Sequence, residues 1–299
     1  MPLPTNENVI ALSQDLIAQL QSQFGKNPGL LLLTGTFIPS PSAPTLSSAP
    51  HFNQSSTPVT VRFSSSTGVP LIPTTIPPPI LVLFPSDSIL ETVHSVDGFP
   101  IRTGEEFLGL SRAIAASPPG GPSPSPIQTF LAAHPAAHRY VATPKPSPSS
   151  LAREAYFGVH AYKFTNKDGK AQFARYRIAP DAGVDHLDTA TTKTKDSDFL
   201  YNELNTRISQ GPVSFHLLAQ IAEDEDTLDD ATVSWPDNRQ VLDLGKITLN
   251  AFVKDNDKEQ KHIIFDPVPR VQGIEPSDDP LLELRAAIYL ISGRQRREA

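Results

Sequence analysis

The sequence predicts an α+β fold built around an antiparallel sheet or barrel. Segments that alternate apolar and polar residues recur through the middle of the chain, and helical patterns lie at both ends, with a further helix inserted. The 299 residues are enough to bury a sizeable core. We expect a single domain over residues 1–299, with an N-terminal helix within 1–25 and a C-terminal helix within 281–297.

The helices are predicted from apolar spacing and capping residues. In the first helix, Val9, Leu12, Leu16 and Leu20 recur at intervals of three and four residues. A later helix opens at Thr103, which stands in the N-cap position with Glu106 three residues on, the capping-box spacing. The predicted helices cover residues 8–24, 103–116, 127–133 and 281–294.

The strands are predicted from β-branched and alternating segments. The clearest pair is a hairpin whose two strands are joined by a turn at residues 166–170. Prolines between residues 70 and 85 leave one short strand-like piece there. An acidic loop at residues 223–226 does not have calcium-loop spacing, so we interpret it as solvated surface. The predicted strands cover residues 57–64, 80–84, 156–165, 171–178, 213–221 and 241–252.

Composition excludes several classes of function. With no cysteine, the chain has no disulfide, zinc knuckle, thiolate-ligated heme or cysteine nucleophile. A net charge of -7 gives no reason to expect a nucleic-acid partner. Without a long apolar run or a leader-like N-terminus, we expect no membrane span and an intracellular, cytoplasmic protein. Peroxisome, mitochondrion and a homo-oligomeric state are left open.

The C-terminal helix carries a candidate metal ligand. Arg285 and Tyr289 are four residues apart, so on a helix they share one face and the guanidinium can reach the phenol oxygen. An adjacent cation favours the phenolate, a hard donor suited to ferric iron. Alone, such a pair is more often a half-buried aromatic beside a snorkelling arginine.

Several segments in order resemble the catalase superfamily, and specifically the small catalase-related peroxidases. The resemblance runs from about residue 24 to residue 297. The segments that carry it are the VRFS strand within 57–64, GFPIRTGEEF at 98–107, FLAAHPAAHRYVATPKP at 130–146, YFGVHAYKFTN at 156–166, RYRIAPDAG at 175–183 and the terminal Arg-x-x-x-Tyr. It implies a catalase-type antiparallel barrel with flanking and inserted helices, binding heme b and its iron.

The resemblance also implies roles for individual residues. Tyr289 matches the tyrosine that ligates heme iron, the axial ligand known for catalases, and Arg285 matches the arginine that holds it as phenolate. Arg62 matches a propionate-binding arginine, and Ser64 the serine that supports the distal histidine. Phe99 and Phe107 match phenylalanines over the heme edge and distal channel, a role compatible with plain core packing.

One part of the family pattern is missing. The catalytic distal histidine belongs to an Arg-x-x-His-Ala-Lys-Gly stretch before the first barrel strand, and this chain has no such stretch between Gly29 and Thr34. His94 stands where larger catalases have a distal asparagine, so it is the remaining candidate for distal acid–base catalysis. The alternative is a strand histidine that faces solvent or a backbone carbonyl.

We therefore expect a heme-dependent peroxidase that reduces hydrogen peroxide or small organic hydroperoxides with an external electron donor, unidentified from the sequence, in the context of oxidative stress. The alternatives are a catalytically impaired heme-binding relative and a heme-dependent rearrangement of fatty-acid hydroperoxides.

Overall fold

The computed structural model describes residues 7–24, 30–64, 80–83, 89–196, 198–264 and 266–298, without the side chains of residues 20–24, 30, 64, 80–83 and 89–92. Its strands form a curled antiparallel sheet with the order β10-β6-β7-β8-β9-β1-β2-β3-β4, and β5 pairs with β7 beside this path. The strands are β1 (Leu30–Pro39), β2 (Thr57–Ser64), β3 (Ile80–Leu83), β4 (Ile89–Val93), β5 (Tyr156–Phe157), β6 (Tyr162–Thr165), β7 (Ala171–Pro180), β8 (Val213–Ile221), β9 (Val241–Phe252) and β10 (Ile274–Pro276).

Helices cover one side of the sheet and project away from it. The longest are α1 (Glu7–Phe24) and α9 (Pro280–Glu298), and the inserted group consists of α3 (Gly104–Ala115), α4 (Pro126–Ala133) and α5 (Pro135–Ala142). The remaining helical segments are α2 (Ala43–Leu46), α6 (Thr189–Thr192), α7 (Phe199–Gln210), α8 (Asn256–His262) and the short 3₁₀ turns η1 (Pro50–Phe52) and η2 (Leu151–Arg153).

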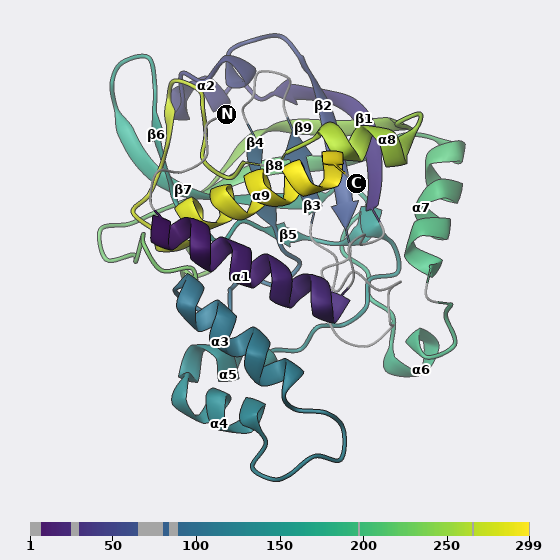
Figure 1. Cartoon of the computed structure of the whole chain (residues 1–299). Helices are drawn as coiled ribbons and strands as arrows, with labels where there is room; N and C mark the ends of the chain where they lie inside the picture. The colour runs from purple at the N-terminus through teal and green to yellow at the C-terminus, as the bar shows by residue number, and fades with distance from the viewer. Residues whose placement is uncertain are drawn as a thin grey trace.

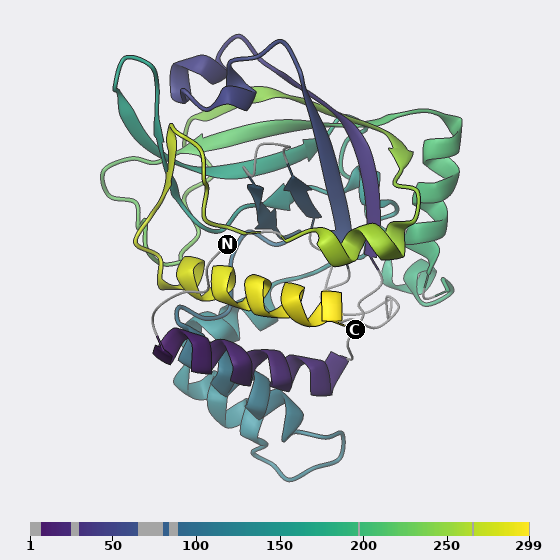
Figure 2. The same ribbon diagram turned by 45° about the horizontal axis from the view of Figure 1, so that its top comes forward.

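The layers are stacked in a fixed order. Figures 1 and 2 show α9 lying across the sheet, α1 packed on the outer side of α9, and α3 to α5 beyond α1. The first and last helices of the chain, α1 and α9, are therefore side by side although they are far apart in sequence. This arrangement places the C-terminal helix between the sheet and the helical layer.

Two apolar clusters stabilise the two sides of α9. The larger fills the curled sheet with side chains such as Phe63, Tyr156, Phe215 and Leu249, all nearly inaccessible to solvent. The smaller joins the helices, with Leu16, Leu108 and Leu284 among its members. Alternation along β2 sends Val61 and Phe63 into the sheet core and Arg62 to the opposite face.

A glycine allows two central strands to approach closely. Gly35 lies at the register shift between β1 and β9, and a Cβ atom there would overlap the carbonyl oxygen of Thr248. Only glycine fits this contact without moving the backbone.

The fold class and most predicted elements are confirmed. Strands β2, β8 and β9 have the predicted bounds, and α1, α3, α4 and α9 lie where their patterns indicate. The first strand of the predicted hairpin is instead split at Gly158–Ala161 into β5 and β6, since β5 pairs near the far end of β7 while β6 pairs beside the turn.

Two local predictions are confirmed only in part. Thr103 caps α3 by accepting from the Glu106 amide at 3.3 Å, but the Glu106 carboxylate accepts from the Arg102 amide at 2.8 Å, so the reciprocal capping box does not form. The acidic loop is solvated at Glu223, Asp224 and Glu225, as predicted, but the Asp226 side chain is only 4 % exposed because it is paired with Arg239. In the described part of the chain, no helix is both long and apolar enough to cross a bilayer.

Candidate functional site

The C-terminal helix presents a polar stripe between its two apolar faces. Arg285, Tyr289, Ser292 and Arg296 recur at helical spacing along α9 and are all half-buried. Leucines on either side belong to the two apolar clusters, and Ala286 and Ala287 are buried. Helical spacing therefore places the four polar residues in one stripe, and burial of the apolar residues on either side determines which way the stripe faces.

Tyr289 lies within electrostatic reach of two arginines from different elements. Burial lowers the pKa of Arg62, on β2, to about 10; a negative charge on Tyr289 raises it and Arg296 lowers it. The pKa of Arg296 is likewise lowered by burial, while Tyr289 acts to raise it. By reciprocity, both guanidinium groups favour a negative charge on the Tyr289 oxygen.

Arg296 has only neutral partners among the described residues. Its guanidinium donates to Ser292 Oγ at 3.2 Å and to the Ile263 carbonyl at 3.2 Å. Sequence analysis did not select Arg296, although its spacing from Tyr289 places both on one helix face. The site thus has a second half-buried cation beside Tyr289, without a carboxylate to neutralise it.

His94 follows β4 and joins that edge of the sheet to β5. Its amide donates to the Phe157 carbonyl at 2.9 Å, and the Phe157 amide donates back at 2.6 Å. The imidazole Nε2 is shielded from solvent and has no hydrogen-bond partner among the described residues. A shielded, unpaired ring nitrogen is costly to keep, so the position is typical of a functional group.

The His94 imidazole is held neutral. Its pKa is lowered to about 3, mainly by desolvation and also by the charges of Arg285 and His160. By surface area the residue is only half-buried. The two observations agree because Nε2 is shielded while other atoms of the residue are accessible. At neutral pH the ring can accept a proton without first losing one.

A buried pair that sequence analysis did not identify lies within electrostatic reach of Arg285. His160 Nδ1 lies 2.7 Å from Asp279 Oδ2, and both side chains are 1 % exposed. Burial acts to raise the pKa of Asp279, but the hydrogen bond and charge of His160, the Leu281 amide and Arg285 together lower it. These residues are 119 positions apart, so no local signal in the sequence identifies the pair.

The two predicted phenylalanines extend from His94. The His94 and Phe99 rings have centroids 5.6 Å apart, and Phe99 and Phe107 make an edge contact at 6.0 Å. Both phenylalanines also pack on the helical cluster. The structure therefore brings His94, Phe99 and Phe107 into one aromatic row.

Some predictions fall outside the described residues. The Ser64 side chain, at the end of β2, is one of these. The distal-histidine stretch was expected between Gly29 and Thr34, where residue 29 lies outside the described residues and residues 30–34 begin β1. Where side chains are described, no three His, Asp or Glu residues gather as a metal-ligand set. A single tyrosine oxygen is a different type of metal ligand from such a set, and Tyr289 remains the candidate metal ligand.

The assembled group combines a phenol oxygen flanked by cations with a neutral, unpaired imidazole. Tyr289 and Arg62 come from opposite ends of the chain, and His94 and Arg285 are linked electrostatically. Such a set can bind an anionic cofactor through its arginines, ligate a metal through oxygen and accept a proton at nitrogen.

Comparison with known proteins gives a consistent result. A family model described as "Catalase" matches residues 94–298. A catalase-related peroxidase of Mycolicibacterium paratuberculosis is 32% identical over 277 residues, which covers 89% of this chain and 86% of that protein. Another, from Synechococcus elongatus, is 29% identical over 297 residues, covering 94% of this chain and 87% of that protein.

Solved structures share the fold. A fungal catalase superposes with a TM-score of 0.78, and catalase A from Saccharomyces cerevisiae with 0.79. Each is 20% identical in sequence, and each superposition covers 90% of this chain. The chain spans 59% and 60% of the lengths of those two proteins, respectively.

Proposed function

Because this chain belongs to the catalase family, we propose that it is a heme-dependent peroxidase that reduces hydrogen peroxide or small organic hydroperoxides with electrons from an external donor. The catalase-related peroxidases among its relatives support an oxidoreductase of this kind. The observation that carries the proposal is that Tyr289 lies within electrostatic reach of the buried Arg62 and the half-buried Arg296. We propose further that residues 1–299 act as one heme-binding domain.

The residues present fit heme b. Tyr289 supplies an oxygen ligand, the type that catalases use. Arg62 and Arg296 supply two half-buried or buried cations suited to the two propionate carboxylates, and Arg296 has no carboxylate partner among the described residues. When bound, the heme iron supplies the redox chemistry of peroxide cleavage.

Arg285 would tune the ligand rather than touch the substrate. It stands one helical turn before Tyr289 and acts electrostatically on Asp279, which is held ionised by His160. A cation fixed in this way favours the phenolate form of a neighbouring tyrosine. The charge of Asp279 then partly balances that of Arg285.

His94 is the proposed acid–base group in place of the missing distal histidine. Its neutral Nε2 can take the proton from the incoming peroxide oxygen and return it to the leaving oxygen, so that water departs. Phe99 packs against the imidazole and keeps bulk water from one side of it. The Ser64 role as support for a distal histidine is retained as part of the proposal.

A second candidate is a heme-binding protein without turnover. The observation in its favour is the absence of any histidine between residues 25 and 34. The two candidates share the heme site and differ only in whether His94 performs acid–base catalysis.

The test is reconstitution of the full chain with hemin, followed by addition of hydrogen peroxide and a reducing dye. A high-spin ferric spectrum together with dye oxidation supports the peroxidase. A heme spectrum without dye oxidation supports the second candidate. Consumption of a fatty-acid hydroperoxide without a donor would indicate rearrangement instead, and the absence of a Soret band would contradict all three.

A further inference from the structure

The segment that carries His94 and Phe99 has no regular secondary structure. It connects β4 to α3 and consists of bends from residue 94 to residue 103. Backbone pairing at His94 holds its first residue, and the Phe99 amide donates to the Ala231 carbonyl at 3.1 Å. The position of the His94 ring therefore depends on what fixes the residues between these two points.

Asp97 lies between His94 and Phe99, and both its side chain and its backbone carbonyl accept hydrogen bonds. Its Oδ2 accepts from Arg177 at 2.8 Å, and its backbone carbonyl accepts from Ser234 Oγ at 2.8 Å. Its Oδ1 is buried and has no hydrogen-bond partner among the described residues. A carboxylate with one oxygen in an ion pair and the other buried without a hydrogen bond costs free energy to bury.

Arg177 lies in the same row of the sheet as His94. His94 pairs with Phe157, and Phe157 pairs with Arg177 on β7. The Arg177 guanidinium lies over the Phe157 ring at 5.2 Å and also donates to the Gly158 carbonyl and to Gln220. Through Arg177, the Asp97 side chain is therefore connected to β7, and β7 is connected to the His94 backbone by way of Phe157.

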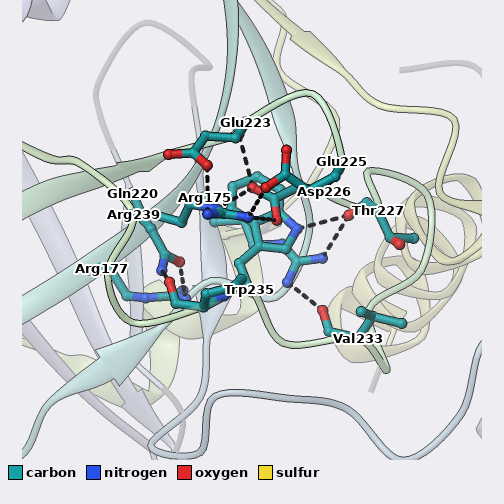
Figure 3. A network of polar contacts seen from close by, with 11 residues as sticks. Arg175, Arg177, Gln220, Glu223, Glu225, Asp226, Thr227, Val233, Trp235 and Arg239 are labelled. Atoms are coloured by element: carbon teal, nitrogen blue, oxygen red, sulfur yellow. Dashed lines mark hydrogen bonds and ion pairs between the residues drawn. The ribbon is translucent and has the colours of Figure 1, made fainter.

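Ser234 and Ala231 belong to a loop that is itself fixed. We call residues 223–239 the acidic brace. Figure 3 shows Arg239 pointing into the acidic side chains of the brace, with ion pairs to Glu223 at 2.6 Å and to Glu225 and Asp226 at 2.9 Å. Its side chain is only 7 % exposed, so these pairs are shielded on the arginine side.

A second arginine holds the other half of the brace. Arg175, fully buried on β7, donates to the carbonyls of Val233 at 2.7 Å and Asp230 at 3.2 Å, and lies over the Trp235 ring at 4.4 Å (Figure 3). Trp235 donates to the Thr227 carbonyl at 2.8 Å. Arg102, at the far end of the bent segment, pairs with Asp229 at 3.0 Å.

From these contacts we infer that Asp97 is a positioning residue for His94: it fixes the imidazole by clamping the bent segment to Arg177 and to the acidic brace. The inference rests on the proposed function, in which His94 is the acid–base group. It assigns the acidic brace a role in the site, because the brace supplies the Ser234 and Ala231 contacts that hold residues 97 and 99. Asp97 itself need not touch the peroxide.

The electrostatic surroundings are consistent with a clamp. Burial raises the pKa of Asp97, Arg177 and Arg175 lower it, and Asp237 raises it. The carboxylate is therefore sensitive to loss of the Arg177 contact. Asp97→Asn keeps the shape of the side chain and removes the charge that holds Arg177.

The first test is a double-mutant cycle on peroxide turnover in the reconstituted full chain. Misplacement of a reacting group can cost about 10²-fold, so we expect Asp97→Asn to lower the rate by about 10–10²-fold in the native background. In a His94→Gln background the same change should cost nothing, since its effect passes through the imidazole. An equal loss in both backgrounds would overturn the inference. Asp168→Asn, in an exposed turn, is the matched control.

The second test does not require heme. Histidine NMR titration of the purified chain should find His94 titrating near pH 3, and Asp97→Asn should raise that value towards 6.5 as the ring is released to solvent. Ser234→Ala, which removes one hydroxyl, should move it in the same direction by less. An unchanged His94 titration in both variants would overturn the inference. Failure of His94→Gln to lower turnover would instead contradict the proposed function, and the titration would then decide the clamp alone.

Discussion

His94 and Phe157 exchange both backbone hydrogen bonds, at 2.9 and 2.6 Å, in a bridge between the end of β4 and β5. This bridge ties the edge of the curled sheet back to the strand pair β5 and β7. It also fixes the backbone of His94, whose shielded Nε2 has no hydrogen-bond partner among the described residues. The same backbone bridge therefore joins the sheet edge to β5 and positions the proposed acid–base group.

The first prediction concerns His94 itself. His94→Gln should lower the rate of peroxide reduction by about 10²–10⁴-fold, the usual contribution of a general acid–base group. The heme spectrum should be retained, because no proposed heme contact is removed. Stopped-flow peroxide kinetics measure the effect, and His138→Gln, at an exposed position, is the control. A variant as fast as the native chain would exclude His94 from the chemistry.

The second prediction concerns the two arginines beside Tyr289. Arg62→Gln and Arg296→Gln should each weaken heme affinity by about 10–100-fold, corresponding to about 1.5–3 kcal/mol for a hydrogen bond to a charged group. Hemin titration followed at the Soret band measures the affinity. Arg294→Gln, exposed on the same helix, should bind heme like the native chain. Equal affinities for all three variants would place the propionates elsewhere.

The third prediction concerns the buried pair His160 and Asp279. The folded-state pKa of Asp279 is lowered, so its contribution to stability is present above the unfolded value of about 3.9 and is lost as the pH falls through the folded value. Asp279→Asn should lower the free energy of unfolding by about 3 kcal/mol at neutral pH. Urea unfolding at several pH values would show the difference between variant and native chain shrinking below about pH 4. A difference independent of pH would contradict this account.

The fourth prediction concerns the acidic brace. Arg239→Met should lower the thermal unfolding midpoint, because it leaves the Asp226 carboxylate buried without its cation. Replacing the exposed Glu225, whose side chain is 68 % accessible, by Gln should have a smaller effect. Calorimetry of the two variants distinguishes a brace centred on Asp226 from a surface cluster in which all three acids contribute equally.

Much of the fold follows from local sequence pattern, and the exceptions have physical causes. The bounds predicted for β8 and β9 from long alternating segments are confirmed, and burial alternates along β8 from Val213 to Ala219. The region from Tyr156 to Thr165 has the same alternation but is divided, because its two halves pair with distant parts of β7. Pairing partners are a tertiary property that a single strand does not encode.

The candidate site divides in the same way. Tyr289 and Arg285 are visible from helical spacing, and Arg296 lies on the same face and could have been selected by extending that spacing. His160 and Asp279, and Asp97 and Arg177, are separated by many residues and meet only in the folded chain. The acidic loop was predicted to be solvated because runs of charged residues usually lie at the surface. Its Asp226 carboxylate is shielded instead, because it pairs with Arg239, 13 residues later in the chain.

The central claim is that Tyr289 is the ligand of heme iron, and the most direct measurement is the absorption spectrum of the hemin-reconstituted chain beside that of Tyr289→Phe. We predict a high-spin ferric spectrum in the native chain that is lost in the variant. Tyr201→Phe, at another half-buried tyrosine, should keep the native spectrum. Identical spectra for the native chain and Tyr289→Phe would contradict the account.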